Sequence, residues 1–293
     1  MKAAAFAYTR ATSVGNAIAL LAQHGERAKV LSGGQSLLPA MNLRLVAPEL
    51  IVDIGSLDEL RVITTRQGIL SIGALVRQVD LQTHPEIAAG APLLKQAVAH
   101  IAHPAIRNRG TIGGSLAHAD PAAELPACMV AVKATIVARG AGGERRIPAA
   151  SFFTGIYETA LSPHELLVAV ELPLEPKKPA HFFGEFARRR GDFAMVGLAA
   201  QAVVENERLT DFRPAFFGVS DRPILVTSAA GLIGKAVTPE ALLEASQALG
   251  RELDPPDDQS ASGAMRRHLA KVLLARCVSE LLGRADLKAG GVA

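Results

Sequence analysis

The chain contains 293 residues, 49% of them hydrophobic and 20% charged, which fits two folded domains and excludes a disordered chain. A formal net charge of +3 and the absence of tryptophan give no support for a nucleic-acid-binding function. Two cysteines, Cys128 and Cys277, are too few for a disulfide framework or for the ligand set of an iron–sulfur cluster.

The N-terminal part of the chain alternates short helices and strands. A helix is predicted after Thr12 or Ser13, either of which can cap it, and Gly25 is its expected end. The apolar stripe of this helix consists of Val14, Ala17, Ile18 and Leu21. The patterns that follow predict strands at 29–31 and 50–54, a hairpin at 60–73 turning at Gln67-Gly68, helices at 93–101 and 123–130, an open turn at 140–143, and strands at 134–138 and 166–172.

A Pro- and Lys-rich stretch at 173–179 interrupts this pattern, so we predict one domain at 1–176 and a second at 177–293. In the second, 195–204 and 212–219 form a predicted hairpin turning near Asn206, followed by helices at 239–249 and 263–282. Strands followed by helices are typical of a small α+β domain. No apolar stretch reaches the ~20 residues of a membrane span and no signal peptide is recognisable, so a soluble cytoplasmic protein is expected.

Two glycine pairs, Gly33-Gly34 and Gly113-Gly114, share a context of small hydroxyl residues. Glycine lets a backbone come close to a ligand, and successive N–H groups in such a loop can bind phosphate oxygens. Two loops of this kind could hold the two phosphates of a dinucleotide. Neither loop has the Gly-x-Gly-x-x-Gly or P-loop pattern, which disfavours a Rossmann NAD site and a nucleotide triphosphatase. Tight turns are the alternative interpretation, since the chain contains 26 glycines.

Longer strings around both loops carry a resemblance to a known family. Residues 29–39 have the sequence KVLSGGQSLLP, residues 104–115 PAIRNRGTIGGS, and residues 119–126 ADPAAELP. RRRGDFA at 188–194 and, more weakly, RRHL at 266–269 follow in the C-terminal part. Together these strings resemble the carbon monoxide dehydrogenase medium-subunit family of the molybdenum hydroxylases, and the resemblance covers essentially the whole chain.

The resemblance implies an α+β fold, in which an FAD-binding domain of the vanillyl-alcohol-oxidase (PCMH) type precedes a smaller C-terminal α+β domain of the CO dehydrogenase flavoprotein type. It implies that both glycine loops wrap the FAD pyrophosphate. The cofactor-binding residues that it indicates are Lys29, Val30, Leu31, Ser32, Gly33, Gly34, Gln35, Ser36, Leu37, Thr111, Ile112, Gly113, Gly114, Ser115, Glu124 and Leu167.

Other positions leave alternatives open. Glu124 replaces the Asp that is frequent in relatives, and Leu167 is either a flavin contact or a strand core residue. Gly184 stands where xanthine-dehydrogenase-like relatives carry a flavin-contacting Lys. The loop at 188–192 lies near the flavin edge or is a solvated charged turn. Asp120, four residues before Glu124, is interpreted as a surface residue that compensates the helix dipole rather than as an acid–base group.

No metal site and no nucleophilic side chain are assigned. His100, His103 and His118 are close in sequence, but without an acidic or cysteine ligand at matching spacing they are interpreted as surface or packing residues.

In this family, a molybdenum–pterin centre in a large subunit hydroxylates the substrate, and two [2Fe–2S] clusters in a small subunit pass electrons to the FAD. The chain is therefore expected to be an electron-transferring FAD subunit in a dimer of heterotrimers, serving an outside acceptor. Gln35 stands where the carbon monoxide enzymes often have His, which favours an organic substrate. The alternatives are a self-sufficient FAD-dependent oxidoreductase with its own substrate pocket, and a scaffold that has lost the cofactor.

Overall fold

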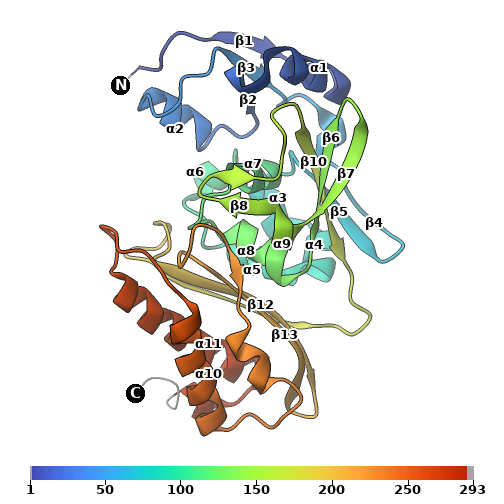
Figure 1. Ribbon diagram of the computed structural model, residues 1–293. Coiled ribbons are helices and arrows are strands. Elements are labelled where there is room, and N and C mark those ends of the chain that lie inside the picture. The colour runs from blue at the N-terminus through green and yellow to red at the C-terminus, as the bar shows by residue number, and fades with distance from the viewer. Residues whose placement is uncertain (1, 289–293) are drawn as a thin grey trace.

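The computed structural model describes residues 2–288, which form an N-terminal part in blue to green and a C-terminal part in yellow to red (Figure 1). A small parallel sheet with the order β1-β3-β2 lies at one end of the molecule. Its strands are β1 (Ala7–Arg10), β2 (Ala28–Leu31) and β3 (Leu50–Asp53). Helix α1 (Val14–His24) packs on this sheet, and Ser13 Oγ caps it by accepting a hydrogen bond from Asn16 N at 3.0 Å. The predicted first helix and its apolar stripe are confirmed.

A five-stranded antiparallel sheet follows, with the order β4-β5-β10-β6-β7. Its strands are β4 (Ile63–Arg66), β5 (Ile69–Gly73), β6 (Thr135–Gly140), β7 (Gly143–Pro148) and β10 (Leu166–Pro173). The predicted hairpin turns at Gln67-Gly68, where both residues have positive φ. The predicted open turn at 140–143 instead closes a second hairpin, and β7 was missed because its first four residues are exposed and polar.

Short helices cover the inner face of this sheet. They are α3 (Gln78–Thr83), α4 (Pro85–Gly90), α5 (Pro92–Val98), α7 (Ile112–His118), α8 (Glu124–Ala131) and α9 (Ala149–Phe152). Helix α6 (Pro104–Arg107) has no buried residue and contacts α3. Helix α2 (Leu37–Asn42) lies between β2 and β3 in the chain. A separate pair of short strands is formed by β8 (Phe153–Gly155) and β9 (Glu158–Thr159). Helix α5 ends three residues before the predicted end at residue 101, and Ala102 has positive φ.

The C-terminal part is a four-stranded antiparallel sheet covered by two helices. Its elements are β11 (Ala180–Phe186), β12 (Val196–Glu205), β13 (Arg208–Phe217), β14 (Ile224–Leu225), α10 (Pro239–Glu252) and α11 (Gly263–Leu282). The predicted hairpin turns at Asn206-Glu207, both with positive φ, and both predicted helices are present. Short 3-10 helices occupy Gly25–Arg27, Asp58–Arg61, Ser228–Leu232 and Ala285–Lys288.

The two parts share a hydrophobic core. Helix α8 packs against β12 and β13, and Ala199, Ala215 and Phe217 belong to the same buried cluster as the apolar side chains of α8. Seven of the eight residues of α8 are buried, so the helix is apolar on all sides rather than striped. The α+β class and the order of the two domains are confirmed. Among residues 2–288, none of the helices has the length and apolar character needed to cross a lipid bilayer.

Candidate functional site: two glycine loops and the pocket between them

A pocket of about 290 Å³ opens at the carboxyl edge of the small parallel sheet. Arg10 and Asp53 end neighbouring strands in register, and Leu31 ends the third. Ligands of α/β sheets bind at this edge, where the loops leave the strands. The pocket is lined by Arg10, Leu31, Ser32, Gly33, Gly34, Leu38, Asp53, Gly55, Ser56, Arg61, Leu75, Arg77, Arg109 and Thr111.

The first glycine loop follows β2, and its residues Ser32, Gly33 and Gly34 line this pocket. Among residues 2–288, no acceptor pairs with the backbone N–H groups of residues 32–36. Gly34 has φ +72°, which turns the chain back so that Leu38 N can donate to Gly34 O at 3.3 Å. The Gln35 side chain holds the loop from within, since Nε2 donates to Gly33 O at 2.9 Å. Because backbone N–H groups need an acceptor, this loop has the donor set of an anion site.

The second glycine loop lies directly against the first. Ser32 Oγ and Thr111 Oγ1 are 2.7 Å apart, and a Cβ on Gly33 would come within 2.3 Å of Arg109 O. Glycine at position 33 is therefore required by the approach of the two loops. The structure brings together the two segments that the sequence singled out, although they are 79 residues apart.

The backbone N–H groups of residues 112–115 in the second loop donate to acceptors inside the protein. Ile112 N donates to Val76 O at 3.0 Å, Gly113 N to Ala74 O at 2.9 Å, and Gly114 N to Thr111 Oγ1 at 3.1 Å. A Cβ on Gly113 would lie 2.6 Å from Ala74 Cβ. Close packing on the chain after β5, rather than approach to a ligand, explains glycine at position 113. The second loop faces the pocket with the Thr111 hydroxyl.

Four arginines of the pocket lining were not predicted from the sequence: Arg10, Arg61, Arg77 and Arg109. Arg10 lies 3.5 Å from Asp53, and Arg77 Nη1 donates to Asn108 O at 2.9 Å. Asp53 is the only carboxylate among the lining residues, so the pocket has an excess of positive charge. Free N–H donors, hydroxyls and guanidinium groups are the partners that phosphate oxygens accept from. Arg109 lies inside the motif at 104–115, whereas Arg10, Arg61 and Arg77 lie outside every motif of the sequence and carried no sequence signal.

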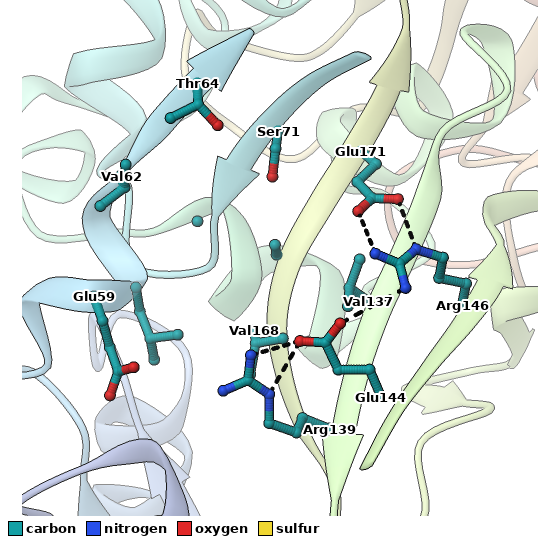
Figure 2. A pocket seen from close by; sticks show the side chains of 13 residues that line it. Glu59, Val62, Thr64, Ser71, Val137, Arg139, Glu144, Arg146, Val168 and Glu171 are labelled. Carbon is teal, nitrogen blue, oxygen red and sulfur yellow. Dashed lines mark hydrogen bonds and ion pairs between the residues drawn. The ribbon is translucent and has the colours of Figure 1, made fainter. Parts of the chain in front are cut away.

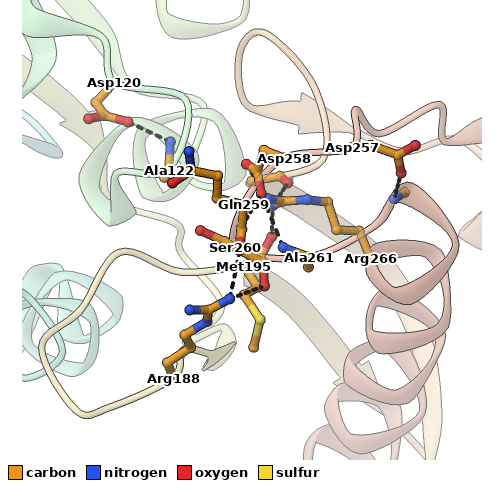
Figure 3. Close-up of polar contacts among 12 residues, drawn as sticks. Asp120, Ala122, Arg188, Met195, Asp257, Asp258, Gln259, Ser260, Ala261 and Arg266 are labelled. Atoms are coloured by element: carbon orange, nitrogen blue, oxygen red, sulfur yellow. Dashed lines mark hydrogen bonds and ion pairs between the residues drawn. The ribbon is translucent and has the colours of Figure 1, made fainter.

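Glu124, the first residue of α8, lies in an environment that favours its neutral form. Burial, together with the charges of Glu185 and Asp120, raises the pKa of Glu124 to about 8. Asp120 lies in the turn before the helix, where its Oδ1 accepts from Ala122 N at 2.8 Å (Figure 3). The hydrogen bond from Ala122 N to the Asp120 carboxylate stabilises this turn. That Asp120 compensates the dipole of α8 remains a prediction.

Glu185, in β11 of the C-terminal part, has its carboxylate near Glu124. Its side chain is 5% exposed, Oε1 lies 3.2 Å from His100 Nδ1, and Oε2 has no partner among residues 2–288. The preceding residue, Gly184, faces the opposite side, because a Cβ there would meet the Phe182 ring at 2.8 Å and Leu273 at 3.3 Å. A long side chain at position 184 would need this packing to change.

Leu167 is not among the residues that line the glycine-loop pocket. It is 4% exposed, pairs with Ala138 across β10 and β6, and belongs to the main hydrophobic core. The register of the two strands shifts between Leu167 and Ala169. The strand-core interpretation of Leu167 accounts for its contacts, and its predicted flavin contact remains a prediction.

The three histidines are separate from one another in their contacts. His100 packs on Phe183 with ring centroids 5.0 Å apart, His103 precedes α6, and His118 stacks on Tyr157 at 4.9 Å. Burial lowers the pKa of His118. Residues 2–288 contain no group of three or more His, Cys, Asp or Glu side chains placed to hold a metal ion.

A second cavity, of about 270 Å³, lies on the face of the antiparallel sheet (Figure 2). Four of its five charged side chains pair with one another: Arg139 with Glu144 at 2.5 Å, and Arg146 with Glu171 at 2.9 Å. The fifth, Glu59, accepts a hydrogen bond from Val14 N at 3.2 Å. These groups are satisfied by their neighbours, in contrast to the free donors of the first glycine loop.

Comparison with known proteins decides the family. Residues 4–175 match the model of the FAD binding domain in molybdopterin dehydrogenase, and residues 181–281 match the CO dehydrogenase flavoprotein C-terminal domain. The chain belongs to the FAD-binding medium subunits of the molybdenum hydroxylases. It therefore carries an FAD-binding domain and is an oxidoreductase subunit.

Relatives match over nearly the whole chain. The alpha subunit of the 6-hydroxypseudooxynicotine dehydrogenase complex of Paenarthrobacter nicotinovorans is 37% identical, covering 97% of both chains. A chain of the carbon monoxide dehydrogenase of Hydrogenophaga pseudoflava superposes with a TM-score of 0.94 at 36% identity, over 97% of this chain and 99% of that one. A chain of quinoline 2-oxidoreductase of Pseudomonas putida 86 gives a TM-score of 0.92 at 37% identity, over 97% and 99%.

Proposed function

We propose that this chain holds FAD with its pyrophosphate at the two glycine loops. The observation that carries the proposal is the row of five backbone N–H groups, residues 32–36, that have no acceptor among residues 2–288. The paired hydroxyls of Ser32 and Thr111 and the guanidinium groups of the pocket supply further donors. The first loop, 29–37, is proposed to bind phosphate through its backbone. The second, 111–115, supports that loop and contributes a hydroxyl.

Glu124 and Leu167 complete the proposed FAD contacts. A carboxyl with a pKa near 8 is protonated at neutral pH, so Glu124 can donate a hydrogen bond to the cofactor. Leu167 offers only apolar contact, and its burial in the core makes it the least supported member of the set. The boundary between the FAD-binding and C-terminal domains is proposed at 176/177, after β10 ends at Pro173 and before β11 begins at Ala180.

We propose further that the chain works in a complex with a large molybdopterin-binding subunit and a small [2Fe–2S] subunit, assembled as a dimer of heterotrimers. Similar proteins carry the names medium chain or complex subunit. Both cysteines of this chain are free and buried, so the chain offers no thiolate cluster of its own to deliver electrons. Buried free thiols also suit the cytoplasm, which is the proposed compartment.

Bound FAD supplies two-electron and one-electron redox chemistry, which suits a junction between iron–sulfur clusters and an outside acceptor. The residues of this chain bind the diphosphate, keep both loops in contact and present Glu124 in its neutral form. The substrate of the complex is proposed to be an organic molecule, since relatives act in 6-hydroxypseudooxynicotine and quinoline oxidation as well as in carbon monoxide oxidation.

The test is to purify the chain, record its absorption spectrum, and identify the cofactor released on heating. Flavin absorption bands and the release of intact FAD are expected. A folded, colourless chain that takes up no added FAD would contradict the binding proposal. Turnover of an organic substrate by the chain alone, without added subunits, would instead favour a self-sufficient oxidoreductase.

A further inference from the structure

Arg266, in the first turn of α11, is a buried charge with an unusual set of partners. It is 4% exposed, and its Nη1 donates to the carbonyl oxygens of Met195 and of Gly218, the latter at 2.7 Å. Its Nη2 donates to Asp258 Oδ2 at 2.5 Å (Figure 3). Because burying a guanidinium is costly unless it is paired, these contacts must hold their segments firmly in place.

The string at 104–115, which contains the second glycine loop, is called the second glycine motif. The two carbonyl groups that Arg266 binds belong to segments of the C-terminal part that contact the chain on either side of this motif. Gly218 N donates to Pro121 O at 2.9 Å, just after that motif. Met195 follows the loop at 188–194, whose Gly191 packs so closely on Ala102 that a Cβ would lie 2.8 Å from Ala102 O. Ala102 precedes the motif, and Arg107 Nη1, inside the motif, donates to the same carbonyl at 3.1 Å. One guanidinium therefore ties together contacts at both ends of the motif.

The loop at 188–194 is also held from its outer side. Asp258 Oδ1 accepts from Ser260 N at 2.7 Å and Ala261 N at 3.0 Å, which shapes a turn before α11. Arg188 Nη2 donates to Gln259 O in this turn at 2.6 Å. Figure 3 shows Arg188 and Arg266 converging on the turn from opposite sides. The same Asp258 carboxylate thus orders the turn and neutralises Arg266.

We propose that Arg266, oriented by Asp258, is a positioning residue of the FAD site, which fixes the loop at 188–194 and the turn at Gly218 against the second glycine motif. The inference rests on the proposed function, since it assigns these two contacts to the environment of the cofactor. Phe193, in the same loop, is 74% exposed.

The chain contains no tryptophan, so Phe193→Trp introduces a single fluorescent indole into the loop at 188–194. Flavin quenches indole emission over short distances, so this variant reports how close the loop lies to bound FAD. In the Phe193→Trp parent with FAD bound, the emission is expected to be quenched and to recover when FAD is removed. Adding Arg266→Met is expected to restore emission while FAD stays bound, and to raise the FAD dissociation constant about tenfold. Arg266→Lys keeps two donors for the two carbonyl groups and is expected to restore most of the quenching.

Arg267→Met in the same parent is the matched control. Arg267 is the next residue of α11 and also donates to a backbone carbonyl, Leu253 O at 3.1 Å, and pairs with an acid, Asp254 at 2.9 Å. Neither partner touches the loop at 188–194, so quenching and FAD affinity are expected to stay at the parent values.

Circular dichroism of each apo variant checks the fold. If Arg266→Met does not fold, Asp258→Asn replaces it, because the Asp258 side chain is 49% exposed and its loss leaves no buried hole. Equal quenching and equal FAD affinity in the parent and in the folded variant would overturn the inference alone. A folded parent that takes up no FAD would overturn the proposed function, and the inference with it.

Discussion

The two glycine loops are similar in sequence but opposite in the use of their backbone. In the first loop, the N–H groups of residues 32–36 have no acceptor among residues 2–288. In the second, the N–H groups of Ile112, Gly113 and Gly114 donate to other groups of the protein. Close packing requires glycine in both loops, at Gly33 and at Gly113, whereas the left-handed turn at Gly34 is found in the first loop. Two similar motifs at one site can thus have different roles: the first loop is suited to bind an anion, and the second supports the first.

The largest effect is expected from Gly113→Val, which tests the supporting role of the second loop. Its side chain would overlap the chain at Ala74, already 2.6 Å from a Cβ at this position. Overpacking of this kind lowers the free energy of unfolding by about 3 kcal/mol. Thermal unfolding of the apo protein measures the loss before any cofactor is added. Gly142→Val is the control, since nothing lies within 4 Å of a Cβ there, and an equal loss in both variants would contradict the packing role.

The next effect is expected from Gly34→Ala, which tests the binding role of the first loop. Alanine at φ +72° costs about 1 kcal/mol, and the added Cβ would lie 3.0 Å from Leu38 Cδ1. The loop can relieve both strains only by shifting its donors, so FAD affinity is expected to fall about tenfold. Titration of the apo variant with FAD measures this change. An affinity equal to that of Gly142→Ala would show that the backbone of the first loop does not bind the cofactor.

A smaller effect is expected at the contact between the loops. Ser32→Ala and Thr111→Val each remove one member of the hydroxyl pair at 2.7 Å, and Thr111→Val also removes the cap of α7. Each variant should lose about 1 kcal/mol of stability, with Thr111→Val losing more because of the cap. If the hydroxyls act as one unit, the double variant loses less than the sum of the single losses. If denaturant unfolding shows fully additive losses, the Ser32 and Thr111 hydroxyls do not stabilise each other.

A dependence of stability on pH, rather than a loss at fixed pH, is expected from Glu124. Its pKa is raised in the folded state to about 8 from 4.5, so the folded state holds the proton more strongly. The stability that this provides is complete below pH 4.5 and is lost as the pH rises through 8. Glu124→Gln should therefore flatten the decline of stability between these values, measured by denaturant unfolding at a series of pH values. A variant with the same pH slope as the natural protein would place the titration on another group.

Local patterns predicted much of the fold. The cap at Ser13, the φ-positive turn at Asn206 and the long apolar runs of β10 and β12 each depend on neighbours in sequence, and each was recognisable there. Strand β7 was missed because it lies at the sheet edge with charged, exposed residues, so no apolar alternation marks it. Strand β11, at the edge of the C-terminal sheet, was missed beside the Pro/Lys stretch.

The sequence alone determined the two glycine loops and their family, because the strings around them are long and specific. Only the tertiary structure decided which donors stay free, since that depends on whether Val76 and Ala74 come within reach of the second loop. It also gathered four arginines from separate segments into one pocket and placed Arg266 behind the contact between the two parts. Hydrogen bonds and close packing act over a few ångströms in space, whatever the separation along the chain.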